Sequence, residues 1–262
     1  MSENILEISN LSKYFGGIAA VSDCSLNVKR GSITGIIGPK GSGKTTLFNL
    51  IAGNLKSSNG YVTFDEENIT DVPSYELFSK GLLRTFQIAH EFTNLSVLEN
   101  LMMVPGNQSG EKIMTALFKP GLVAQEEAVI KDKAKEVVDF LNLGHLSNEL
   151  AGNLSGGQKK LLELGRTMMV DAKLVLLDEV GAGVNRTLLK DLGTAIEKLN
   201  REKGYTFCMI EHDMDFIGRL CDPVIVMAEG SVLFEGSVEE AKKDEKVIES
   251  YLGRGSKLKD TK

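Results

Sequence analysis

The sequence predicts an α/β fold, and three observations lead to this class. In the last third of the chain, apolar runs such as KLVLLD at 173–178 and TFCMIE at 206–211 alternate with segments of helical character. Strands that are apolar without alternation, and that are separated by helices, are typical of a sheet covered on both faces. The first 65 residues favour short strands and turns, whereas 74–166 favours helices. We therefore expect an α/β body that carries an inserted, mostly helical lobe.

Each expected element follows from a local pattern. Short runs of branched and aromatic residues bounded by Gly, Asn or Asp predict strands, and apolar residues that recur every three or four positions predict helices. The expected strands are 5–8, 25–28, 32–37, 61–64, 82–87, 173–178, 206–211, 224–227 and 231–236, and the expected helices are 47–55, 74–82, 96–104, 123–143, 158–169, 187–203 and 213–220. The polar segments 105–110 and 253–262 are expected to be a loop and a frayed tail.

Composition and charge exclude several classes of protein. At 262 residues, 42% apolar and 25% charged, the chain has the composition of an ordinary globular protein. Its net charge of −6 argues against nucleic acid as the main partner. The longest uninterrupted apolar run, Val224 to Ala228, is far shorter than the roughly 20 residues of a spanning helix, and no secretory signal pattern opens the chain. We expect a cytoplasmic protein. Cys24, Cys208 and Cys221 are expected to be buried thiols, because three cysteines without CxxC spacing predict neither a disulfide framework nor a zinc site.

A phosphate-binding loop is the strongest motif. Residues 38–45, GPKGSGKT, match the pattern G-x-x-x-x-G-K-[ST]. The glycines bring backbone N–H groups to phosphate oxygens, the lysine places a charge between the β- and γ-phosphates, and the last hydroxyl suits Mg²⁺. A glycine turn that only caps a helix would fit the same letters, but this motif follows an apolar strand and opens an apolar-faced helix. The sequence therefore predicts nucleotide binding by Gly38, Pro39, Lys40, Gly41, Ser42, Gly43, Lys44, Thr45 and Thr46, with Thr45 as a magnesium ligand.

Two acids end the apolar strand at 174–179, LVLLDE. Neighbouring side chains on a strand point to opposite faces, so Asp178 and Glu179 are expected to have different roles. Asp178 suits Mg²⁺, held through water, and Glu179, beyond the strand end, suits orientation or deprotonation of the attacking water. Two acids that only cap and solubilise a strand are the alternative, which the presence of a phosphate loop disfavours.

The segment LSGGQ at 154–158 predicts a second anion site. It places a serine and two glycines at the start of an expected helix, but it has no lysine. A serine N-cap with a glycine turn is the alternative; it explains Ser155 and leaves Gly157 without a reason. Two half-sites for phosphate in one chain suggest a site shared between two chains. Taken alone, Gln87 and His212 are ambiguous, and His90 and His145 are interpreted as surface residues.

Together these motifs resemble the nucleotide-binding subunits of ABC transporters. An aromatic near Phe15, GPKGSGKT, Gln87 in RTFQ, LSGGQ, LVLLDE, GAGVN at 181–185 and His212 in EHD occur in the order typical of that family, over about residues 4–253. The resemblance implies an α/β, P-loop NTPase (RecA-like) core with an N-terminal antiparallel β subdomain and an inserted helical subdomain. It also implies a nucleotide-binding lobe of 1–86 and 167–240, a helical signature lobe of 87–166, and a C-terminal helix and tail at 241–262.

The resemblance also implies roles for residues around the nucleotide of the same chain. Phe15, or its neighbour Tyr14, is similar to the aromatic that stacks on adenine. Gln87 resembles the residue that meets Mg²⁺ and the attacking water. Glu179 is similar to the catalytic base, and His212 to the histidine that joins this base to the γ-phosphate.

Other roles concern the contact between two chains. Ser155 and Gly157 resemble the residues that bind the γ-phosphate held by the opposite subunit, and Asn185 lies where the family's interface loop crosses. Two positions depart from the common pattern. Val180 stands where proline is common, which predicts a less rigid turn, and Lys40 stands where asparagine is frequent and is expected to face solvent.

A narrower likeness concerns the transported solute. RTFQ, then FTNLSVLEN, EHDMDFI and the terminal VIESYLG, are similar to one of the two ATPases of branched-chain amino acid importers. This implies ATP and Mg²⁺, membrane permease subunits, a second ATPase subunit in a homo- or heterodimer, indirect contact with a solute-binding protein, no nucleic acid, and a place on the inner face of the cell membrane. The alternatives are importers of urea or amides, an ATPase for lipid export, an ABC ATPase of DNA repair or translation, and a module that binds nucleotide without hydrolysis.

Overall fold

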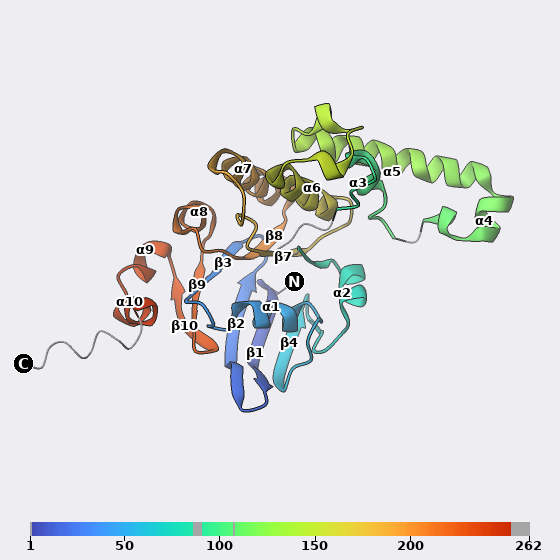
Figure 1. Cartoon of the computed structure of the whole chain (residues 1–262). Helices are drawn as coiled ribbons and strands as arrows, with labels where there is room; N and C mark the ends of the chain where they lie inside the picture. Colours follow the sequence, from blue (N-terminus) through green and yellow to red (C-terminus); the bar gives the residue numbers. More distant parts are fainter. Residues whose placement is uncertain (1, 86–90, 107, 253–262) are drawn as a thin grey trace, which may run out of the picture. The chain divides into compact units, whose positions relative to one another are not determined.

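The computed structural model describes residues 2–85, 91–106 and 108–252, which fall into two compact units. The first unit is drawn from 1–84, 173–181 and 197–262, and the second from 85–172 and 182–196. Two sheets lie in the first unit, and the second is helical. Figure 1 shows both units with most of their helices and strands labelled.

An antiparallel sheet forms the N-terminal part of the first unit. Its strands are ordered β2 (Ile18–Lys29), β1 (Asn4–Phe15), β4 (Asn59–Phe64) and β5 (Glu67–Asn68). β1 and β2 are much longer than the short runs that predicted them. Polar residues such as Ser9, Asn10 and Ser12 break the apolar pattern, but the ladder with β2 continues past them through shifts in register. The expected antiparallel β subdomain is confirmed.

A mostly parallel sheet forms the rest of the first unit. Its strand order is β10 (Ser231–Gly236), β9 (Val224–Ala228), β3 (Ile33–Ile37), β8 (Thr206–Ile210), β7 (Leu174–Asp178) and β6 (Leu82–Arg84). Only the edge strand β10 runs antiparallel to its neighbour among the described strands of this sheet. Every residue of β3, β7 and β8 is buried, as the continuous apolar runs predicted.

Helix α1 (Lys44–Ile51) packs against both sheets of this unit. Its residues Leu47, Phe48, Leu50 and Ile51 share one core with side chains of β1, β2 and β4 and with alternate residues of β3, β7, β8 and β9. The opposite face of the parallel sheet contacts α8 (Met214–Leu220): a side chain at Gly35 of β3 would lie 3.2 Å from Ile217 Cδ1. The first unit also holds α2 (Ser74–Lys80), α9 (Val238–Ala241) and α10 (Glu245–Leu252).

The second unit consists of α3 (Val97–Met102), α4 (Ile113–Phe118), α5 (Pro120–Phe140), α6 (Gly156–Met168), three 3₁₀ turns (Ser109–Glu111, Gly144–Leu146 and Ala151–Asn153) and the first part of α7 (Arg186–Lys203). Ser96 and Glu99 form a capping box that fixes the start of α3. A side chain at Gly165 of α6 would lie 2.7 Å from Leu141 and 3.3 Å from Leu101, so α3, α5 and α6 approach each other closely at this glycine.

Smaller expectations concern the strand at 82–87, the histidines, the cysteines and membrane-spanning helices. The strand expected at 82–87 ends at Arg84, and 86–90, with Gln87 and His90, lies outside the described residues, as does the tail 253–262. His145 is exposed, as expected. The three cysteines are free and buried, and burial raises the pKa of Cys24 to about 11 and of Cys208 to about 12. Within the described part of the chain, no helix combines the length and apolarity that a membrane crossing requires.

Candidate active site

The phosphate loop joins the end of β3 to the start of α1. Gly38, Gly41 and Gly43 all have positive φ, at 148°, 82° and 98°. A Cβ at Gly38 would collide with the carbonyl oxygen of Met227, and one at Gly43 with the carbonyl oxygen of Ala20, so the fold requires glycine at both positions for conformation and for space. The loop delivers the chain directly into α1, whose N-terminal N–H groups favour an anion.

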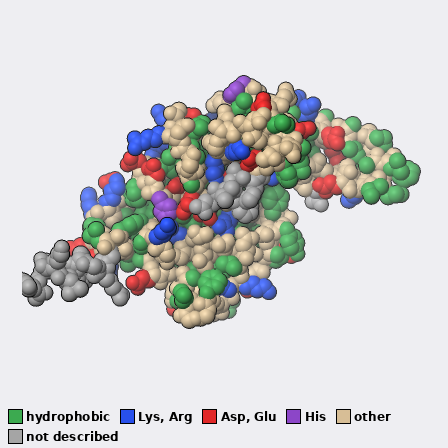
Figure 2. Space-filling model, in the orientation of Figure 1, with side chains coloured by type: hydrophobic (Ala, Val, Ile, Leu, Met, Phe, Trp, Pro, Cys, Tyr) green, Lys and Arg blue, Asp and Glu red, His purple; other side chains and the backbone are tan. Residues whose placement is uncertain are grey.

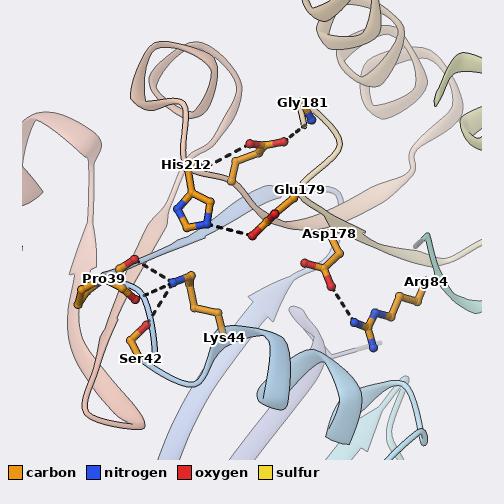
Figure 3. A network of polar contacts seen from close by, with 10 residues as sticks. Pro39, Ser42, Lys44, Arg84, Asp178, Glu179, Gly181 and His212 are labelled. Carbon is orange, nitrogen blue, oxygen red and sulfur yellow. Dashed lines mark hydrogen bonds and ion pairs between the residues drawn. The ribbon is translucent and has the colours of Figure 1, made fainter. Parts of the chain in front are cut away.

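Lys44 lies across this loop. Its ammonium donates hydrogen bonds to the carbonyl oxygens of Gly38 (2.8 Å) and Pro39 (3.0 Å) and to Ser42 Oγ (3.3 Å), as Figure 3 shows. Burial lowers the pKa of Lys44, while the carboxylates of Glu179 and Asp178 act in the opposite direction. A buried cation is thus held at the loop by oxygen atoms alone. Lys40 is exposed, as expected.

The register of the parallel sheet brings the acids to this loop. Asp178, the last residue of β7, pairs with Ile210 of β8, and Ile210 pairs with Ile36 of β3, two residues before Gly38. The carboxyl ends of the three strands therefore meet at one edge of the sheet, where ligands bind in open α/β folds. Side chains predicted from distant segments, Lys44 and Asp178 among them, converge there.

Glu179 and His212 contact each other at this edge. His212 Nε2 lies 3.0 Å from Glu179 Oε1, and Figure 3 shows the two side chains directed toward one another. Glu179 has a left-handed backbone with φ of 49°, and its N–H donates to the carbonyl oxygen of Ile210 at 2.9 Å. The next residue, Val180, is buried, so packing holds the turn at the position where the common proline is missing.

Glu211 is a buried residue of this site that sequence reasoning missed. Its carboxylate accepts hydrogen bonds from the backbone N–H of Gly181 at 2.6 Å and of His212 at 3.1 Å. Burial raises the pKa of Glu211, and these two donors oppose the shift. Glu211 therefore ties the segment after Glu179 to the segment that carries His212. Its place directly after an apolar strand, like that of Glu179, is the signal that could have identified it.

Arg84 and Asn49 were also missed. Arg84 Nη2 donates to Asp178 Oδ2 at 2.7 Å, and Arg84 Nη1 donates to Asn49 Oδ1 at 2.6 Å. The pair is buried, with 10% of the Arg84 side chain and 5% of the Asp178 side chain exposed. No local sequence pattern predicts this contact, because 94 positions separate Arg84 from Asp178.

The aromatic residues expected at adenine are accessible. Phe15, at the end of β1, is 48% exposed, and Tyr14 is 47% exposed. The Lys13 ammonium lies 5.3 Å from the centre of the Phe15 ring, a cation–π contact that orients the ring. Phe15 remains the predicted stacking residue.

The segment LSGGQ at 154–158, called the signature segment from here on, lies in the second unit. Ser155 is the N-cap of α6: its hydroxyl accepts from Gln158 N–H, and Gln158 Oε1 accepts from Ser155 N–H, which completes a capping box. A Cβ at Gly157 would collide with the side chain of Leu188 on α7. Packing therefore supplies a reason for Gly157 that the sequence alone did not. Asn185 caps α7 by accepting from Leu188 N–H at 2.9 Å.

The residues of the first unit fit a magnesium–phosphate group. The loop offers backbone N–H groups, a buried cation and the hydroxyl of the exposed Thr45, and the carboxylate of Asp178 has the hard oxygen atoms that Mg²⁺ prefers. Among the described residues no cluster of three or more His, Cys, Asp or Glu side chains could hold a metal ion. Mg²⁺ is typically bound through one or two carboxylates together with the phosphates of the substrate.

The family model, the relatives and the solved structures that resemble this chain all concern ABC transporters. The ABC transporter family model matches residues 21–182. A probable branched-chain amino acid transport ATP-binding protein of Archaeoglobus fulgidus is 42% identical over 249 residues, which is 95% of each chain. The ADP conformation of an ATP-binding cassette of an ABC transporter superposes with a TM-score of 0.82 at 38% identity, covering 96% of this chain and all of the other. A dimeric post-hydrolysis cassette bound to ADP and phosphate has a TM-score of 0.72 at 25% identity, over 89% of this chain and 98% of the other.

Proposed function

The chain belongs to the ABC transporter family as an ATP-binding subunit with ATPase activity, and from that premise we propose that it powers an importer of branched-chain amino acids. The solute is supported by the relatives, since the Archaeoglobus protein and a Pseudomonas aeruginosa protein at 34% identity, which covers 97% of this chain, are both described as branched-chain amino acid transport ATP-binding proteins. The catalytic roles are supported chiefly by one observation: the contact between His212 and Glu179 at the strand edge that also carries Lys44 and Asp178.

In this proposal the phosphate loop binds the triphosphate. Lys44 exchanges its contacts with loop carbonyls for contacts with the β- and γ-phosphates, and the N–H groups of the loop and of the first turn of α1 donate to phosphate oxygens. Phe15 stacks on the adenine. Thr45 and Asp178, together with Gln87 outside the described residues, would hold Mg²⁺, which when bound neutralises charge on the phosphate oxygens.

Hydrolysis is assigned to the pair of Glu179 and His212. The Glu179 carboxylate accepts the proton of the attacking water, and the imidazole of His212 holds the carboxylate in position through Oε1. Glu211 fixes the backbone of His212 and of Gly181 and thereby keeps the two segments in register. The left-handed backbone of Glu179 turns its side chain away from the path of the strand.

We assign a trans role to the signature segment. The N-terminus of α6, with Ser155 and Gly157, would bind the γ-phosphate held by a second ATPase subunit, so that two subunits enclose two nucleotides. The dimeric cassette among the relatives supports this assembly. The proposed partners are the paired ATPase, membrane permeases and, indirectly, a solute-binding protein, and the proposed location is the inner face of the cell membrane.

ATP-dependent dimerisation tests the assembly. We expect the slow Glu179→Gln variant to form a dimer with ATP, alone or with the paired ATPase, as measured by size-exclusion chromatography with light scattering. A Ser155→Arg substitution should abolish this dimer and leave ATP affinity unchanged by calorimetry, because Ser155 would contact only the partner's nucleotide. An ATP-bound chain that stays monomeric in both arms contradicts the composite site.

Transport assays test the solute. The chain is reconstituted in liposomes with the proposed permease and binding-protein partners, and phosphate release is measured with the binding protein loaded with leucine, isoleucine, valine, urea or an aliphatic amide. We expect stimulation by the three amino acids. Stimulation by urea or the amide without stimulation by the amino acids overturns the proposed solute and leaves the ATPase assignment intact.

A further inference from the structure

The short helix α4 has an unusual orientation. Ile113, Met114, Leu117 and Phe118 are exposed by 83%, 67%, 69% and 69%, whereas Thr115 is partly buried. Positions 113, 114, 117 and 118 lie on one face of a helix. The apolar face of α4 thus points into solvent. Figure 2 shows hydrophobic side chains gathered at the end of the helical unit where Figure 1 places α4.

Two cations bracket this apolar face. Lys112 is the N-cap of α4, and Lys119 links it to α5; both are exposed, and no acidic side chain lies between them. An apolar face with lysines at its two ends is typical of a segment that lies at a membrane interface, where the lysine ammonium groups reach anionic headgroups. We propose that α4 binds the surface of an anionic lipid bilayer and inserts Ile113, Met114, Leu117 and Phe118 among the acyl chains.

This inference rests on the proposed membrane location and adds a direct lipid contact to it. Lipid suits the surface better than a protein groove does, because the four side chains are all highly exposed on one six-residue helix and cations flank them on both sides. Each lysine near an anionic surface contributes about 1 kcal/mol, so two should raise binding to anionic vesicles by at least about tenfold over neutral ones.

The absence of tryptophan from the chain allows a sharp test. A Phe118→Trp variant carries a single tryptophan on α4, and a Tyr61→Trp variant is the control, since Tyr61 is 64% exposed on β4. With vesicles of phosphatidylcholine and phosphatidylglycerol, we expect a blue shift and quenching by brominated lipid for Phe118→Trp, weaker changes with phosphatidylcholine alone, and none for Tyr61→Trp.

Binding variants complete the experiment. Leu117→Ser with Phe118→Ser should reduce cosedimentation with anionic vesicles by at least about tenfold, while Tyr61→Ser with Tyr75→Ser, which removes two other exposed aromatic residues, should not. No vesicle binding by a chain that binds ATP normally overturns the lipid contact and leaves the proposed function standing. A fluorescence shift seen only after the permeases are added also overturns it, in favour of a protein contact.

Arg84, the last residue of β6, supports a second and independent inference. Its guanidinium is held on three sides: Nη2 on Asp178, Nη1 on Asn49 of α1, and one face 5.9 Å from the centre of the Phe48 ring. The ion pair uses Asp178 Oδ2 and leaves Oδ1 out of the contact. Because Nη1 is bound to Asn49, the planar guanidinium holds Nη2, and with it Asp178 Oδ2, in one place, which a flexible lysine would do less well.

We infer that Arg84 is a positioning residue for the magnesium site: by binding Oδ2 it would leave Oδ1 of Asp178 for the metal, and it couples that carboxylate to α1, the helix that begins at Lys44. The inference rests on the proposed role of Asp178. Residues that orient a metal ligand in this way typically affect metal affinity by about 10- to 100-fold. A buried ion pair with a purely structural role would instead affect stability alone.

The dependence of ATP affinity on Mg²⁺ separates the two roles. In EDTA we expect Arg84→Gln to bind ATP with the same affinity as the unmodified chain. The increase in ATP affinity on addition of Mg²⁺, measured by calorimetry, should be about tenfold smaller in this variant. Arg84→Lys retains the buried charge, so it should fold even if Arg84→Gln does not. It should also restore part of the rise in ATP affinity that Mg²⁺ provides. Arg30→Gln is the control, because the Arg30–Asp65 ion pair has a similar length of 2.6 Å.

An unchanged Mg²⁺ gain in folded Arg84→Gln or Arg84→Lys overturns the positioning role. If Asp178→Asn also leaves the Mg²⁺ gain unchanged, the proposed magnesium role of Asp178 fails as well, and the two failures are thereby distinguished.

Discussion

Replacement of Glu179 by glutamine isolates the chemical step. The substitution keeps the shape of the side chain, and the amide can still form a hydrogen bond with His212 Nε2, which lies 3.0 Å from the carboxylate. The amide cannot accept a proton from water at neutral pH. The hydrogen bonds of the Lys44 ammonium are accepted by Gly38, Pro39 and Ser42, so the phosphate loop should remain intact.

The expected loss follows from this difference. Removal of a positioned base typically slows turnover by about 10²- to 10⁴-fold, which corresponds to roughly 3 to 5 kcal/mol of barrier height. His212→Ala removes the group that positions the carboxylate and should also slow turnover. Since the two residues contact each other directly, the double variant should be about as slow as Glu179→Gln alone, as for residues that act as a unit.

Phosphate release by the assembled subunits provides the assay, with nucleotide affinity measured by calorimetry on each variant. Glu66→Gln is a matched control, since Glu66 also has a left-handed backbone with φ of 69° and lies in the turn between β4 and β5. Turnover of Glu179→Gln within about fivefold of the unmodified protein would refute the assignment of the base. Losses that multiply in the double variant would refute the coupling to His212.

Three further predictions follow from individual contacts. Lys44→Ala should weaken ATP binding by about tenfold or more, because a charge-assisted contact is lost; unchanged affinity by calorimetry would contradict the loop assignment. Gly157→Ala should cost about 1 to 3 kcal/mol in urea unfolding through collision with Leu188, whereas Gly156→Ala, with its nearest neighbour at 3.7 Å, should not; equal stability of the two variants would disprove the packing reason. Hydrogen bonds from Lys173 and Arg30 lower the pKa of Asp65, so its charged form stabilises the fold above the unfolded pKa of about 3.9, and this stability is lost as pH falls through the lower folded value. Asp65→Asn should therefore be about 1 kcal/mol less stable at pH 7 and should converge with the unmodified protein in strong acid; a gap that persists there would be inconsistent with the pair.

Features with a local pattern were predictable from the sequence. The phosphate loop combines fixed residue types with a strand before it and a helix after it, and the structure has this arrangement from Ile33 to Ile51. The buried strands were predictable for the same reason, because apolar runs without alternation leave no solvent face. The length of β1 and β2 was not, since a ladder partner stabilises polar stretches that have no strand signal of their own.

Contacts between distant segments were not predictable. The Arg84–Asp178 pair depends on the neighbouring placement of β6 and β7, and the Lys173–Asp65 pair joins residues 108 positions apart. Gly157 was selected by its motif, but the need for a small residue there arises from Leu188 on another helix. The segment 113–118 was not assigned to any element from the sequence, and only the structure reveals the helix α4 with its apolar face exposed.

The separation of Asp178 from Glu179 shows how a local rule and the folded chain combine. Strand alternation predicted different roles for the two carboxylates, and their side chains have different partners, but β7 ends at Asp178, and Glu179 already has a left-handed backbone. The different directions of the two side chains therefore arise from the turn after β7 as well as from strand alternation. Asp178 is drawn toward Arg84 and α1, whereas Glu179 is turned toward His212 at the end of the neighbouring strand. One acid can thus be fixed by a buried cation while the next stays accessible to water, and a metal ligand and a proton acceptor can occupy consecutive positions.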